Sequence, residues 1–227
     1  MIYAPSLACA NQLNLESDLR ELLDLGLNCI HFDIMDGHYV PNICLSMDTG
    51  TRLKQVFPQV DLDVHVMVSD PEAYVDRVAA MGARYMTFHL GAAKFPLRLI
   101  DRIKAAGMQA GVAINPSEPI SLLEPLLNRA DLILLMSIEP GFAGVAFIDE
   151  TYTRLAELAR IRTEGKLPFD ISLDGGISTP IAKKLIGLGA DILVLGYPNL
   201  FNQPEGITAA WNRAKTALES DRILGLE

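Results

Sequence analysis

Residues 15 to 37 read LESDLRELLDLGLNCIHFDIMDG, and this stretch holds one complete copy of the unit from which the fold is built. Its leucines recur at the spacing of one helical face, at Leu15, Leu19, Leu22 and Leu23. Gly26 follows, and glycine is favoured just past a helix end because the backbone there often takes a left-handed conformation. The next apolar run, Cys29–Ile34, predicts a strand. The stretch therefore predicts a helix, a glycine stop and a buried strand.

The same unit recurs along the chain. Three more glycines close predicted helices: Gly82, Gly107 and Gly189. Asp70-Pro71 and Ser178-Thr179-Pro180 supply helix starts, because in each a polar capping residue stands before a proline that suits the first helical turn. Eight apolar runs predict strands at Ile2–Leu7, Cys29–Ile34, Leu62–Val68, Tyr85–His89, Gln109–Ile114, Leu132–Met136, Asp170–Leu173 and Ile192–Leu195. These runs are apolar at both alternating positions, which is typical of parallel strands covered on both faces.

Eight strand–helix units favour a closed barrel of the α/β class over an open sheet. The chain has no linker, low-complexity segment or break in composition, so residues 1–227 predict a single-domain (β/α)8 TIM barrel. The first turn after a strand lacks the GxGxxG pattern of a dinucleotide-binding sheet. Trp211, in the last predicted helix, is interpreted as a packing residue between that helix and the barrel.

The composition limits the partners that we expect. The formal net charge is −9, with 19 Lys and Arg against 28 Asp and Glu, which argues against a nucleic-acid-binding surface. Three cysteines without a CxxC spacing predict no disulfide framework and a reducing, cytoplasmic location. The N-terminal residues predict no signal peptide. No apolar run approaches the roughly 20 residues of a membrane-spanning helix, so we expect no membrane partner.

Polar side chains stand at or near the carboxyl ends of three predicted strands, where a buried polar group needs a partner. These are His31, Asp33, His65 and Asp174. Barrel enzymes place their chemistry at this end, and two imidazoles with two carboxylates suit one divalent ion such as Zn²⁺, Fe²⁺, Mn²⁺ or Co²⁺. The alternative is a set of hydrogen-bonded core residues. His89, at another strand end, is interpreted either as a supporting residue of the site or as a core histidine.

Glycines cluster after each of the last three predicted strands, at Gly141, Gly144, Gly175, Gly176 and Gly196. Glycine lets the backbone approach an anion closely and turn its N–H groups toward it, and the following helix N-termini add a favourable dipole. Barrels commonly bind phosphate after strands seven and eight. The three clusters together predict a phosphate site.

Five motifs follow one another along the chain: Pro5-Ser6-Leu7, the segment from His31 to Asn42 (HFDIMDGHYVPN), Asp63–Val68 (DVHVMV), Met136–Phe142 (MSIEPGF) and Asp174–Ile177 (DGGI). With these motifs in this order, the sequence resembles a known family, the ribulose-phosphate 3-epimerases, over nearly its whole length. The resemblance implies a metal-dependent isomerase that acts on a ketose phosphate, and a homo-oligomer.

The resemblance also implies roles for particular residues. The metal would be held by His31, Asp33, His65 and Asp174, with Asp33 and Asp174 as catalytic acid and base. Ser6 and His65 would contact the substrate, and Met35, Met67 and Met136 would line the reacting region. The phosphate would be bound by Gly144, Gly175, Gly176 and Gly196. Gly141 and Tyr197 are also predicted to contact the substrate, with the Tyr197 amide as an additional donor.

Three departures from the family pattern concern the substrate. The loop after strand six reads GFAGVAF at residues 141–147, without the family's usual second glycine, glutamine and small polar residue. The loop after strand eight reads GYPNLF at residues 196–201, which is one residue longer than in the pentulose enzymes and lacks their serine. Cys9 replaces a usual serine or asparagine. The first two features resemble the related allulose-6-phosphate 3-epimerases.

The implied reaction interconverts D-ribulose 5-phosphate and D-xylulose 5-phosphate, with the C3 proton exchanged between two carboxylates through a metal-stabilised ene-diolate. The alternative is a D-allulose 6-phosphate 3-epimerase that forms D-fructose 6-phosphate. A metal-dependent hydrolase or aldolase and a non-catalytic sugar-phosphate binder remain competing classes, because a barrel does not fix a function. A Schiff-base aldolase is disfavoured, since none of the eight predicted strands contains a lysine.

Overall fold

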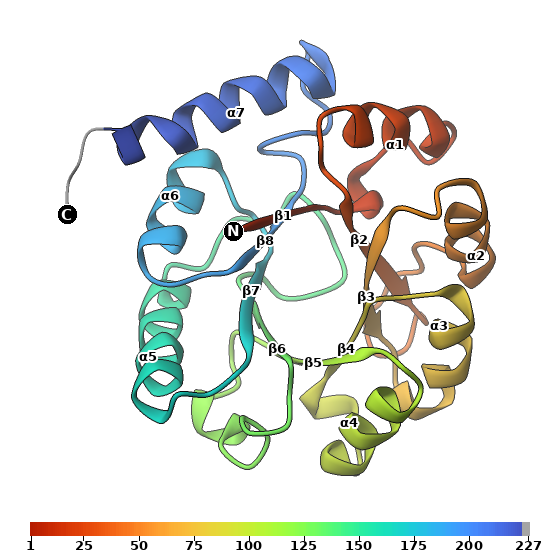
Figure 1. Ribbon diagram of the computed structural model, residues 1–227, viewed down its shortest axis with the longest axis vertical. Coiled ribbons are helices and arrows are strands. Elements are labelled where there is room, and N and C mark those ends of the chain that lie inside the picture. The colour runs from red at the N-terminus through yellow and green to blue at the C-terminus, as the bar shows by residue number, and fades with distance from the viewer. Residues whose placement is uncertain (224–227) are drawn as a thin grey trace.

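The computed structural model describes residues 1–223, with the side chains of residues 1–219. Figure 1 shows a ring of strands at the centre of the molecule with the helices around it. The strands are β1 (Ile2–Pro5), β2 (Cys29–Met35), β3 (Asp61–Met67), β4 (Tyr85–His89), β5 (Gln109–Ile114), β6 (Leu132–Met136), β7 (Asp170–Asp174) and β8 (Ile192–Leu195). All pair in parallel, in the order β1-β8-β7-β6-β5-β4-β3-β2. The predicted single-domain (β/α)8 barrel is confirmed.

The ring closes between the first two strands. β1 pairs with β8 along its length, from Ile2 beside Ile192 to Pro5 beside Leu195. β1 and β2 are joined only by the parallel bridge between Ser6 and His31, which lies just past the end of β1. Among the described residues, this is therefore the junction with the least pairing, and it lies beside the candidate ligands.

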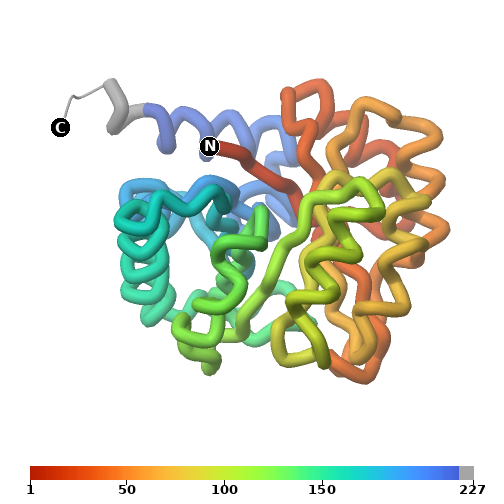
Figure 2. Tube along the Cα trace, turned by 60° about the horizontal axis from the view of Figure 1, so that its bottom comes forward, coloured from red at the N-terminus to blue at the C-terminus, as the bar shows by residue number. Residues whose placement is uncertain are grey.

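Helices follow seven of the eight strands: α1 (Leu15–Asp24), α2 (Met47–Val56), α3 (Val75–Met81), α4 (Pro96–Ala105), α5 (Glu150–Gly165), α6 (Thr179–Gly187) and α7 (Gly206–Ile223). Figure 2 shows them against the outside of the barrel. The chain between β5 and β6 forms only the 3-10 turn η4 (Ile120–Leu123), so the expected eighth helix is absent from the described chain. Pro116, Pro119 and Pro125 explain this difference, because proline inside a helix removes a hydrogen bond and clashes with the preceding turn.

The limits of some predicted elements were wrong by a few residues. The first strand ends at Pro5, and the chain turns through η1 (Leu7–Cys9) instead of continuing to Leu7. The predicted helix after Asp70 begins as the 3-10 turn η2 (Pro71–Tyr74) before α3. The helix-closing glycines were predicted correctly, since Gly26, Gly82, Gly107 and Gly189 all have positive φ. No helix within residues 1–223 is long and apolar enough to cross a membrane.

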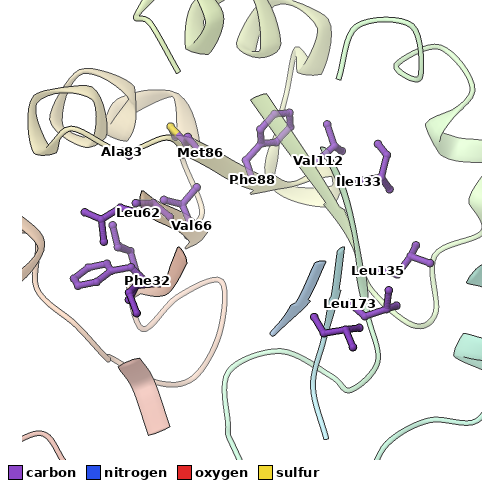
Figure 3. Packing of buried hydrophobic residues seen from close by; sticks show 14 of the residues in the cluster. Phe32, Leu62, Val66, Ala83, Met86, Phe88, Val112, Ile133, Leu135 and Leu173 are labelled. Carbon is purple, nitrogen blue, oxygen red and sulfur yellow. The ribbon is translucent and has the colours of Figure 1, made fainter. Parts of the chain in front are cut away.

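The core has two parts because the barrel wall is buried on both sides. Side chains such as Phe32, Val66 and Phe88 belong to the larger cluster shown in Figure 3, which packs the strands against the helices. A smaller cluster, with Tyr85, Leu134 and Met136 among its members, fills the barrel interior. Trp211 is buried on α7, and its ring lies 5.1 Å from that of Tyr3 in an edge-on contact. The predicted packing role of Trp211 is therefore confirmed.

Candidate active site and metal centre

The structure brings the four predicted ligands together at the carboxyl ends of β2, β3 and β7. One ligand atom from each of His31, Asp33, His65 and Asp174 lies within 4.8 Å of the others. The parallel register explains part of this arrangement, because Asp33 on β2 stands directly beside His65 on β3. His31 and Asp33 project to the same side of β2, as their spacing of two residues requires.

The two imidazoles point a ring nitrogen at the same carboxylates. His31 Nε2 lies 3.2 Å from Asp33 Oδ1, and His65 Nδ1 lies 3.3 Å from the same oxygen. Asp174 Oδ2 is slightly farther, 3.7 Å from His31 Nε2 and 3.8 Å from His65 Nδ1. Both ring nitrogens are buried and make no hydrogen bond. Unpaired imidazole nitrogens that converge with carboxylate oxygens fit the ligand set of a borderline divalent ion.

Each imidazole is held from behind by a second residue. His31 Nδ1 lies 2.7 Å from Asp63 Oδ2, and His65 Nε2 lies 2.8 Å from His89 Nε2. Hydrogen bonds of this kind fix the ring orientation and the tautomer of a ligating histidine. Sequence reasoning left the role of His89 open and missed Asp63. The available signal was the position of Asp63 two residues before His65, on the same side of β3.

The surroundings of the two carboxylates shift their pKa values in opposite directions. Burial opposes ionisation of Asp33, but the nearby His31 and His65 hold the pKa of Asp33 well below its ordinary value. Burial raises the pKa of Asp174; His31 opposes this rise and the charge of Asp33 adds to it. Ser6 Oγ donates a hydrogen bond of 2.7 Å to Asp33 Oδ2. The protein's own charges therefore favour an ionised Asp33 beside an Asp174 that takes up a proton more readily.

A cavity of about 340 Å³ opens from this cluster to the surface. Ten of the eleven predicted substrate-binding residues line it: Ser6, Met35, Met67, Met136, Gly141, Gly144, Gly175, Gly176, Gly196 and Tyr197. The eleventh, His65, is fully buried behind the lining. Cys9 also lines the cavity, and burial raises the pKa of its thiol to about 12, so the group is neutral at ordinary pH.

The glycine loops after β6, β7 and β8 line the same cavity. Gly176 has φ +64, and an added Cβ would lie 2.8 Å from both Phe147 N and Val145 O, so the β7 loop packs directly on the β6 loop. Within residues 1–223, the amide N–H groups of Gly176, Ile177 and Gly196 donate to no protein acceptor. No Lys or Arg of the described chain lines the cavity. An anion here would therefore be bound by backbone amides.

Comparison with known proteins agrees with this geometry. A model of the ribulose-phosphate 3 epimerase family matches residues 2–199. The chain belongs to this family. One relative is the ribulose-phosphate 3-epimerase of Escherichia coli K12, which is 35% identical over 204 residues, with 90% of each chain covered. Another is the ribulose-phosphate 3-epimerase of Bacillus subtilis 168, which is 36% identical over 194 residues, with 85% of this chain and 89% of that protein covered. The predicted membership of the epimerase family and of the isomerase class of enzymes is confirmed.

Solved structures with lower sequence identity share the epimerase family's fold. Phosphoribosyl anthranilate isomerase from Thermus thermophilus superposes with a TM-score of 0.69 at 15% identity, covering 98% of this chain and 100% of that one. The 3-hexulose-6-phosphate synthase of Salmonella typhimurium gives the same TM-score at 18% identity, with 96% and 98% covered. At these identities the likeness supports the barrel architecture alone.

Proposed function

We propose that this protein is a ketose-phosphate 3-epimerase that interconverts D-ribulose 5-phosphate and D-xylulose 5-phosphate. One observation carries the proposal: two carboxylates, the buried Asp33 and the partly buried Asp174, line one cavity that is also lined by glycine loops with unpaired backbone amides. The first feature suits a proton transfer next to a carbonyl, and the second suits a phosphate. The names of the related epimerases support the same substrate.

The residues that would hold a divalent ion are His31, Asp33, His65 and Asp174. Zn²⁺, Fe²⁺, Mn²⁺ and Co²⁺ all suit this mixed set of imidazoles and carboxylates. When bound, the ion would supply a Lewis acid for the negative charge that develops on the oxygens of the reacting ketose. Asp63 and His89 would keep both imidazoles oriented.

The proton transfer is assigned to Asp33 and Asp174. Epimerisation at C3 needs a base on one face of the carbon and an acid on the other, and the two residues come from β2 and β7, three strands apart around the ring. The low pKa of Asp33 and the raised pKa of Asp174 favour opposite protonation states. Ser6 holds Asp33 Oδ2, which leaves Oδ1 turned toward the imidazoles. The roles of the two carboxylates exchange when the reaction runs in reverse.

A D-allulose 6-phosphate 3-epimerase is the second candidate. The observation that favours it is the β8 loop, where Tyr197 and Pro198 line the cavity in a loop one residue longer than in the pentulose enzymes that the sequence resembles. Proline has no N–H to donate, so this loop binds an anion with fewer amides. A hexulose phosphate has one more carbon between C3 and the phosphate than a pentulose phosphate has.

The purified protein is incubated in deuterated water with D-ribulose 5-phosphate or D-allulose 6-phosphate. We expect deuterium at C3 together with formation of the epimer, which neither a hydrolase, an aldolase nor a non-catalytic binder would give. Comparison of kcat/KM then identifies the substrate, with a tenfold preference, or about 1.4 kcal/mol, as the criterion. We expect the pentulose phosphate to be preferred, and a tenfold preference for the hexulose phosphate would reverse the assignment.

The family resemblance also predicts a homo-oligomer, and the cysteine pattern predicts a cytoplasmic location. Light scattering on the purified chain would measure the oligomeric state directly, and a monomer at micromolar concentration would contradict this expectation.

A further inference from the structure

Asn199 is a buried polar residue in the loop between β8 and α7, outside the metal cluster. Its exposed fraction is 2%, although an amide side chain is costly to bury without hydrogen bonds. Both ends of the amide have partners. Nδ2 donates to Ile177 O at 2.6 Å, and Oδ1 accepts from Thr179 Oγ1 at 2.9 Å. Asn199 therefore joins its own loop to the segment that runs from β7 into α6.

The two joined segments carry the unpaired amides of the cavity. Gly176 and Ile177 belong to the β7 loop, and Ile177 is itself the residue whose carbonyl Asn199 binds. Gly196 begins the β8 loop, and its carbonyl accepts from Leu200 N at 3.1 Å, so Asn199 lies in a tight turn that starts at Gly196. The side chain of Asn199 thus fixes the distance between the donors of the two loops.

We propose that Asn199 is a positioning residue for phosphate recognition, which holds the amides of the β7 and β8 loops at the spacing that one phosphate group requires. This inference rests on the proposed function, because it assumes that the glycine-lined part of the cavity receives the phosphate. Because no Lys or Arg of the described chain lines the cavity, neutral backbone donors would have to bind the phosphate. Weak neutral donors bind an anion well only when several are held in place beforehand, since otherwise binding must order the loops.

The test uses two variants and one control in the full-length protein. Asn199→Ala removes both hydrogen bonds between the loops, and Thr179→Val removes only the one that Thr179 donates. Ile103→Val changes a fully buried residue of α4, a helix that does not follow β7 or β8, and so controls for a general loss of stability. For each protein, inorganic phosphate is titrated by calorimetry, and kcat/KM is measured for D-ribulose 5-phosphate and for D-ribulose.

We expect Asn199→Ala to weaken phosphate binding and to lower the ratio of the two kcat/KM values, each by about tenfold or roughly 1.4 kcal/mol. Thr179→Val should shift both quantities in the same direction by less, and Ile103→Val should shift neither. Phosphate affinity equal to that of the unchanged protein in both variants would overturn the inference, as would an equal loss for the two sugars. If the unchanged protein turns over no ketose phosphate, the proposed function fails, and the phosphate titration still decides the role of Asn199.

Discussion

At the scale of single residues, the two carboxylate oxygens of Asp33 have different neighbours. Oδ2 accepts the hydrogen bond from Ser6, and Oδ1 faces His31 and His65. The same side chain therefore carries a proposed ligand atom and a proposed base. Asp174 differs, since its Oδ2 lies farther from both imidazoles and burial raises its pKa.

Replacement of either carboxylate should abolish the proposed epimerisation. Asp33→Asn and Asp174→Asn each remove a proton carrier, and loss of a general acid or base typically costs about 10²–10⁴-fold in rate. The rate is measured as deuterium exchange at C3 in deuterated water. Asp48→Asn, an exposed position on α2, is the control and should leave the rate unchanged. Turnover near the original rate in either site variant would show that its carboxylate does not transfer the proton.

Asp63→Asn should weaken metal binding without unfolding the chain. Asp63 is the partner of His31 Nδ1 at 2.7 Å, and loss of such a partner commonly lowers metal affinity about 10–100-fold. Competition with a chromophoric chelator measures the affinity for Zn²⁺ or Mn²⁺. Asp61→Asn, on the same strand but in an exposed pair with Arg84, is the matched control. Equal affinities in the two variants would mean that the contact behind His31 does not orient the ligand.

The sequence could predict those site residues whose position depends only on the direction and the two-residue repeat of a strand. Asp33 and His31 follow from the two-residue repeat of a strand and from the chemistry of barrel ends. Asp63 was missed because its spacing from His65 shows only which side of β3 it occupies, and the register between β2 and β3 is what places it beside His31. Asn199 was missed because its partners lie about 20 residues earlier, and nothing local in the GYPNLF segment indicates that its side chain turns toward them.

At the scale of elements, the strands were predictable because a buried parallel strand is a short apolar run, and helix ends because glycine marks them. The eighth helix was predicted from the regularity of the other seven units. The segment between β5 and β6 contains prolines at 116, 119 and 125, which disfavour an α-helix, and it forms a 3-10 turn instead. The glycines of the loops after β6, β7 and β8 could be read from the sequence, but the contacts between these loops could not.

The contact between the β6 and β7 loops predicts a large effect of Gly176→Ala. The residue has φ +64, where a side chain costs about 1–2 kcal/mol, and its Cβ would stand 2.8 Å from two backbone atoms. We expect a lower free energy of unfolding and a higher KM for the ketose phosphate. Gly187→Ala is the control, because no atom lies within 4 Å of that Cβ position and alanine favours the helix. Denaturant titration checks both, and equal stabilities would contradict the proposed packing.

At the scale of the whole molecule, the proposed ion would connect strands that pairing alone leaves weakly joined. The ligands come from β2, β3 and β7, which lie on either side of the junction between β1 and β2, where one bridge closes the ring. A chelator should therefore remove activity and also lower the melting temperature. At an ion concentration 100 times Kd, binding contributes about 2.7 kcal/mol, which corresponds to a rise in Tm of roughly 5–10 °C for a chain of this length.

The ligand set also predicts which divalent ions restore activity and Tm. Mn²⁺, Co²⁺, Fe²⁺ or Zn²⁺ should restore both activity and Tm to chelator-treated protein, because imidazole nitrogens bind these ions well. Ca²⁺ should restore neither, since it prefers six to eight oxygen ligands and the cluster offers two imidazoles and two carboxylates. Calorimetric melting and C3 exchange are measured on the same samples, with Asp63→Asn requiring more metal for the same shift. Full activity in protein stripped of metal would contradict the assignment, and recovery with Ca²⁺ would show that the two imidazoles are not ligands.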